Sequence, residues 1–175
     1  MKVLRNSRVP LAVGAAALLP CAFFGSTALV TWIAAHAAWL TLPTALGAPF
    51  AVPRLSLVPF GERPGATVAV ELLAVVVLAV VAAAWTARAL RRRPDPGPWR
   101  SSASGWWAFT VGLAAANVPR ALVPAWEMGL GPLGWYGMLL GGLLAALLWG
   151  LLLGWVCVLP RLLLRAPTPL PAREP

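Results

Sequence analysis

The chain has 175 residues, of which 60% are hydrophobic and only 11% are charged, and its formal net charge is +9. Soluble domains are usually about half apolar and about one quarter charged, so this composition excludes a water-soluble globule and indicates an integral membrane protein. The excess of arginine over lysine, together with abundant alanine, glycine and proline, is typical of a GC-rich bacterial genome.

The positive charge raises the question of nucleic-acid binding. The basic residues lie at the ends of apolar segments, where membrane insertion places them. No stretch interleaves basic residues with stacking aromatics as nucleic-acid grooves do. We therefore expect no nucleic-acid partner.

A basic N-terminus, residues 1–8, precedes a first predicted span from about residue 11 to 40. A cleaved signal peptide is the alternative, because Ala35, His36 and Ala37 form an A-x-A pattern. The apolar stretch before that pattern is about 25 residues long, against about 7–15 in a signal peptide. The length favours an uncleaved helix and leaves cleavage as the alternative.

Residues 41–65 form a proline-rich loop that remains apolar. Proline removes a backbone donor and disfavours helix at the preceding residue. A fully solvated loop would expose its apolar side chains to water. We expect this outer loop, between helices 1 and 2, to lie on the membrane surface or to fold back onto the helices.

The second predicted span covers about 67–87, and the third covers about 105–126 after a polar, arginine-rich connection. The third span is the weakest, because it contains Asn117, Pro119 and Arg120. Arginine at a helix centre costs about 2.5–3.5 kcal/mol on insertion scales and less near an interface. Tryptophans at both ends, Trp106 and Trp126, favour insertion as interfacial anchors.

The fourth predicted span, about 135–159, is leucine-rich and uncharged, and a proline-rich tail, 166–175, is expected to be disordered. The sequence therefore predicts an all-α membrane protein whose single membrane domain, 9–165, is a four-transmembrane-helix bundle.

Basic residues orient this bundle. Three of them, Arg54, Arg63 and Arg120, fall on one side of the membrane. The other eleven fall on the opposite side: Lys2, Arg5, Arg8, Arg88, Arg91, Arg92, Arg93, Arg100, Arg161, Arg165 and Arg173. The positive-inside rule then predicts an N-in/C-in, multi-pass protein of the plasma (inner) membrane. The same arginines are expected to contact anionic lipid headgroups.

Small residues recur every four positions in the fourth span, at Gly142, Ala146, Gly150 and Gly154. We call these four residues the small-residue stripe. Such spacing lets helix backbones approach closely in lipid. The stripe predicts either packing within one bundle, which we favour, or a homodimer contact.

The candidate functional residues are Glu71, Asn117, Arg120 and His36, which we call the polar cluster. At about 1.5 Å per residue, Glu71 and Arg120 lie at similar depths on neighbouring antiparallel spans, and His36 could approach from the first. Intramembrane charges suggest a site for a proton, an ion or a small polar group. The other interpretation, which we favour, is an ion pair that only fixes helix register.

The sequence offers few residues for thiol, acid–base or metal chemistry. The two cysteines, Cys21 and Cys157, lie at different predicted depths and are expected to be free thiols. Five acidic residues and one histidine leave no recognisable catalytic, metal or cofactor motif. A lone histidine near an interface usually contacts headgroups, and a pH-sensing or proton-relay role is the alternative.

These observations predict a non-enzymatic structural or accessory component of a membrane complex, with a membrane-protein partner or a second copy of the chain. The alternative is a small oligomeric transporter or channel whose polar site lies near Glu71 and Arg120. Polar groups occur only in the outer halves of the spans, which favours the first interpretation.

Overall fold

The computed structural model describes residues 2–37, 39, 49–56, 65–93 and 97–164, and this part of the chain is helical with no β-strand. The predicted tail and parts of the two connections before and after the second span lie outside the described residues. The elements are α1 (Lys2–Gly25), α2 (Thr27–His36), α4 (Gly65–Arg92), α5 (Pro98–Glu127), α6 (Pro132–Leu153), the 3₁₀ turn η2 (Gly154–Cys157) and α7 (Val158–Leu163).

Three helical stretches are long and apolar enough to cross a membrane: Arg8–Gly25, Thr67–Arg92 and Pro132–Leu163. They correspond to the first, second and fourth predicted spans. The third prediction falls on α5, which at 30 residues is long enough but is not among these apolar stretches. The protein is thus an all-helical chain with three helical stretches that could span a membrane.

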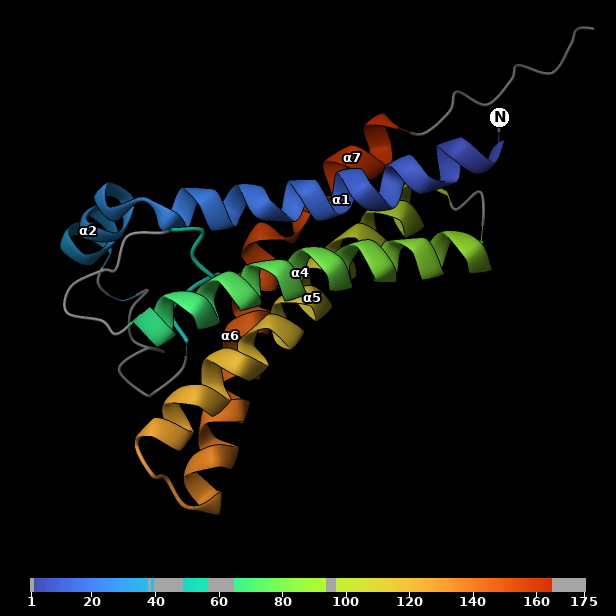
Figure 1. Cartoon of the computed structure of the whole chain (residues 1–175). Helices are drawn as coiled ribbons and strands as arrows, with labels where there is room; N and C mark the ends of the chain where they lie inside the picture. The colour runs from blue at the N-terminus through green and yellow to red at the C-terminus, as the bar shows by residue number, and fades with distance from the viewer. Residues whose placement is uncertain (1, 38, 40–48, 57–64, 94–96, 165–175) are drawn as a thin grey trace, which may run out of the picture.

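The helices pack in a layered order, with α1 against α4, α4 against α5 and α5 against α6. In Figure 1, α1 and α4 lie side by side and run in opposite directions, and the connected ends of α5 and α6 extend away from them. The last helix, α7, packs against both α1 and α5 and so connects the C-terminal part of the chain to the first helix.

Although it is the least apolar of the long helices, α5 occupies the middle of the bundle. Its buried residues recur around the helix and include small residues that allow close contact. A Cβ added at Gly112 would lie 2.9 Å from the Leu78 carbonyl oxygen of α4, and one added at Gly105 would lie 2.9 Å from the Cys157 carbonyl oxygen. Neighbouring helices therefore cover much of α5 at close range.

The first predicted span, 11–40, is divided into two helices at Ser26, which differs from the single helix expected. The Leu55 backbone N–H donates to the Cys21 carbonyl oxygen at 3.0 Å. A Cβ at Gly25 would clash with the Leu55 carbonyl oxygen, so the backbone of the loop packs directly against α1 where that helix ends.

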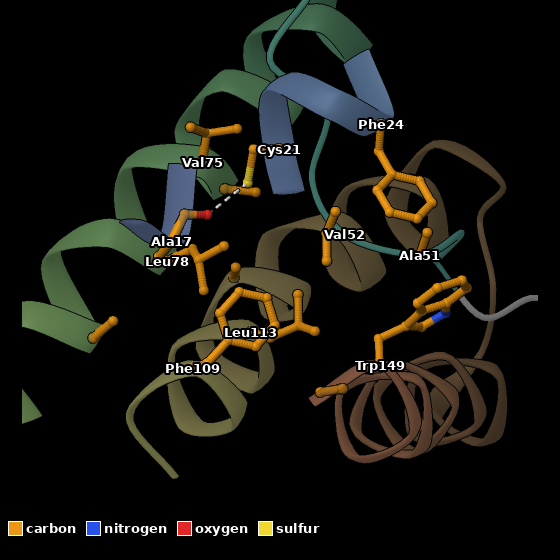
Figure 2. Close-up of a cluster of buried hydrophobic side chains, with 14 of the residues drawn as sticks. Ala17, Cys21, Phe24, Ala51, Val52, Val75, Leu78, Phe109, Leu113 and Trp149 are labelled. Carbon is orange, nitrogen blue, oxygen red and sulfur yellow. Dashed lines mark hydrogen bonds between the residues drawn. The ribbon is translucent and has the colours of Figure 1, made fainter. Parts of the chain in front are cut away.

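Residues 49–56, which we call the inserted segment, account for that contact. Ala51, Val52 and Pro53 are almost fully buried. Figure 2 shows Ala51 and Val52 between Phe24 of α1 and Trp149 of α6. The prediction that the apolar loop folds back onto the helices is therefore confirmed for this part of it.

The two cysteines are free, as predicted. Cys21 belongs to the core in Figure 2, where its thiol lies 3.5 Å from the Ala17 carbonyl oxygen. The Cys157 thiol lies 3.7 Å from the Val13 carbonyl oxygen. Each thiol thus finds a backbone acceptor on α1.

The fourth predicted span is longer than expected and changes from α-helix to a 3₁₀ turn at Gly154–Cys157. Trp106 of α5 packs against this turn, since a Cβ at Gly154 would lie 2.5 Å from the Trp106 ring. The turn leads into α7, which places Arg161 against α5.

The small-residue stripe faces α5 within the same chain. Gly142 contacts Asn117, and a Cβ at Gly150 would lie 2.4 Å from the Thr110 hydroxyl oxygen. Ala146 is also buried. The stripe therefore lets α5 and α6 approach each other, and its four positions are occupied inside the protomer.

We predict that Gly150→Leu destabilises the protein by about 1–3 kcal/mol, because the new side chain overpacks the contact with Thr110. Gly137→Leu is the matched control, since no atom lies within 4 Å of a Cβ at that exposed position of the same helix. Unfolding in mild detergent, followed by circular dichroism against temperature, measures both. Equal stability of the two variants would contradict the packing.

Candidate functional site

Arg120, deep within α5, forms the centre of the polar cluster. Its Nε lies 3.0 Å from Glu71 Oε1 in an ion pair with α4. Its Nη1 donates to Asn117 Oδ1 at 2.8 Å, one turn earlier on α5. Its Nη2 donates to the Phe50 carbonyl oxygen of the inserted segment at 2.9 Å. All three nitrogens of the guanidinium therefore have acceptors within the protein.

Glu71 is also held twice. One carboxylate oxygen pairs with Arg120, and Oε2 accepts the Arg54 backbone N–H at 2.8 Å. The carboxylate thus satisfies a backbone donor of the inserted segment while it neutralises the arginine. A buried ion pair is tolerated only when such further hydrogen bonds complete it.

Asn117 extends the network to α6. Its Nδ2 donates to the Gly142 carbonyl oxygen at 2.8 Å. A Cβ at Gly142 would lie 3.3 Å from the Asn117 Cβ, so the glycine permits the close approach that this bond needs. The first member of the small-residue stripe therefore serves the polar network as well as the packing.

The inserted segment presents its backbone groups through a turn at Ala51, whose φ of 49° lies in the left-handed region. This conformation costs about 1–2 kcal/mol for a residue with a side chain. Aromatic contacts hold the turn, because the Phe50 ring lies 6.5 Å from both Phe24 and Trp149. The Arg54 guanidinium lies 5.4 Å above the same ring.

The network is nearly closed to solvent. Asn117 and Arg120 are 1% and 6% exposed, and the Glu71 side chain is 16% exposed. Donors and acceptors are matched among four parts of the chain: α4, α5, α6 and the inserted segment. Chemically, such an arrangement holds helices in register and leaves little hydrogen-bonding capacity for a ligand.

His36 makes no described contact with this network. It ends α2, and its Nδ1 lies 3.1 Å from the Trp32 carbonyl oxygen. Its ring stacks on the Trp32 ring at 5.1 Å. The residue is exposed.

Sequence counting placed Glu71 and Arg120 at one depth, and the structure brings these two and Asn117 together. The contacts that the structure describes for His36 are with Trp32, and none of them involves Glu71, Asn117 or Arg120. The sequence missed the backbone partners, namely the Phe50 and Gly142 carbonyls and the Arg54 N–H. Backbone groups occur at every residue, so no sequence signal marks these three.

Among the described residues, no group of three or more histidine, cysteine or acidic side chains is placed to hold a metal ion. Comparisons with protein-family models, curated proteins and solved structures find no match to this chain.

We predict that Arg120→Met destabilises the protein by about 3–5 kcal/mol, because it leaves a buried carboxylate without its counter-ion. Combining it with Glu71→Gln should restore part of that loss, with a coupling energy of about 0.5–3 kcal/mol. Chemical unfolding of the single and double variants in detergent measures the cycle.

The control is His36→Ala, which should change stability by no more than about 0.5 kcal/mol, as is usual for an exposed residue. Additive effects of the two cluster substitutions would show that Glu71 and Arg120 do not act as a pair.

Proposed function

We propose that the protein is a four-span, N-in/C-in component of the bacterial plasma (inner) membrane, with a non-enzymatic structural or accessory role in a membrane complex. The observation that carries the role is the closed polar cluster. Its charged and amide groups form hydrogen bonds with one another and with the backbone, so they hold the helices of the bundle together.

The packing of α5 supports the insertion of this helix as the third of four spans. The helix lies between α4 and α6, both of which belong to apolar stretches long enough to cross a membrane. Its only charge between Arg100 and Glu127 is Arg120, and Glu71 neutralises that charge. Burial among apolar helices therefore removes the main objection to inserting α5, which is the cost of exposing arginine to lipid.

The distribution of charge supports the orientation. Arg88, Arg92, Arg100 and Arg161 surround one cavity at one end of the bundle. The N-terminus of α1 lies at this same end in Figure 1. Under the positive-inside rule this end faces the cytoplasm.

The outer surface supports a lipid or protein environment. Large apolar side chains remain exposed along α6, including Leu140, Leu144, Leu147 and Leu151. An apolar groove of about 860 Å³ also runs between α1 and the 153–164 region. Apolar surface of this extent is normally covered by membrane or by a partner.

We predict that single cysteines on a background without Cys21 and Cys157 will react from opposite sides. Trp99→Cys, at the exposed start of α5, should react with an impermeant maleimide only in inside-out vesicles. Met128→Cys, which follows α5 and is 59% exposed, should react in intact spheroplasts. Reaction of both positions from one side would show that α5 does not cross the membrane.

The role itself is tested with the double variant Glu71→Gln/Arg120→Met, in which the charges of the cluster are removed together. Wild type and variant are solubilised in mild detergent, and copurifying proteins are identified by mass spectrometry. We expect the same membrane partners from both, and a normal host phenotype for the variant once it is inserted. Lost phenotype with unchanged insertion and partners would instead favour a transporter or channel.

A further inference from the structure

A second group of charged residues lies at the opposite end of α4 and α5 from the polar cluster. A cavity of about 530 Å³ opens between the end of α4, the start of α5 and α7. Its lining includes five arginines: Arg88, Arg92, Arg93, Arg100 and Arg161. We call this cavity the arginine pocket. Its volume lies within the range of small-molecule sites, about 300–1,000 Å³.

Arg161 forms the buried part of the pocket. The residue is 5% exposed, and its Nη1 donates to Ser104 Oγ at 2.8 Å. Among the residues that the structure describes, its buried Nε has no hydrogen-bond partner. A buried charge without a counter-ion is costly, so an anion would stabilise this guanidinium.

The fold brings Arg161 to this position by a close helix contact. A Cβ at Gly105 would lie 3.2 Å from the Arg161 Cδ and 3.0 Å from the Val158 Cα. The glycine therefore lets α7 settle against α5 beside Ser104. The four other arginines are exposed, and membrane topology alone would explain them, whereas it does not explain a buried one.

The acidic residues that the structure describes lie elsewhere. Glu71 pairs with Arg120, and Glu127 lies at the far end of the 30-residue α5 from the Pro98 end that borders the pocket. Guanidinium groups gathered in one cavity repel one another. An anion with several acceptor oxygens would relieve that repulsion and give Arg161 a counter-ion.

We propose that the arginine pocket binds a phosphoryl group, supplied by an anionic phospholipid headgroup or by a soluble phosphate. Arginine forks match phosphate oxygens, and basic pockets between helices at the cytoplasmic surface suit lipid phosphates. Trp85 and Trp107 border the cavity, and indole rings favour the headgroup level. Binding of a lipid headgroup depends on the orientation proposed above, whereas binding of a soluble phosphate does not.

Two probes separate these sources with the full-length protein. Phosphatidylglycerol is added to nanodiscs of phosphatidylcholine, and its retention is measured by native mass spectrometry. Inorganic phosphate is titrated calorimetrically in neutral detergent without anionic lipid. Binding of either probe by the wild type supports the proposal, and the probe that binds identifies the source.

Variants locate the binding. Arg161→Gln and Arg88→Gln should each raise the Kd about tenfold, the value of one charge-assisted hydrogen bond. Arg91→Gln is the matched control, because it removes the same charge from an exposed position of α4 that does not line the pocket. Its Kd should stay within about twofold of the wild-type value. If Arg161→Gln does not fold, the comparison of the Kd of Arg88→Gln with that of Arg91→Gln decides whether the pocket is the binding site.

Three results would overturn the proposal. In the first, Arg91→Gln weakens binding as much as Arg88→Gln does, which would mean that only diffuse charge attracts the probes. In the second, neither probe binds the wild type. Binding that appears only in Asp95→Asn would mean that the chain's own carboxylate occupies the pocket. Because the cysteine labelling reports orientation separately, failure of this site is distinguishable from failure of the proposed topology.

Discussion

The structure depends on the burial of one arginine. Arg120 lies on the central helix, where a charge without partners would prevent close packing. Its three nitrogens find acceptors on α4, on α5 itself and in the inserted segment. Each acceptor comes from a different part of the fold, so the guanidinium sets the positions of these parts relative to one another. Asn117 then carries the same network to α6.

This requirement accounts for other features of the fold. To deliver the Phe50 carbonyl, the loop after α2 must enter the core, and its entry ends α1 at Gly25. To bring Asn117 to a helix carbonyl, α6 needs glycine at position 142. The break in the first helix and part of the small-residue stripe are thus consequences of accommodating a charge.

The buried arginines at the two ends of the bundle differ in how many partners they have. At the end with the polar cluster, a carboxylate, an amide and backbone oxygens satisfy Arg120 within the chain. At the other end, Arg161 is equally buried, but its described partner is one hydroxyl. The first arrangement is complete as a structural element. In the second, Arg161 lines a cavity and its Nε has no acceptor among the described residues, which is why we assign a ligand to it and not to the first.

The sequence by itself determined the helical class, three apolar stretches long enough to span a membrane, and the shared depth of Glu71 and Arg120. These follow from apolar length, charge position and a constant rise per residue, which are properties of a linear chain in lipid. The tertiary structure alone decided the break at Ser26, the entry of residues 49–56, the orientation of the small-residue stripe toward α5 and the burial of Arg161. Backbone carbonyls are chemically alike at every residue, so which of them meets a guanidinium depends on how the helices pack.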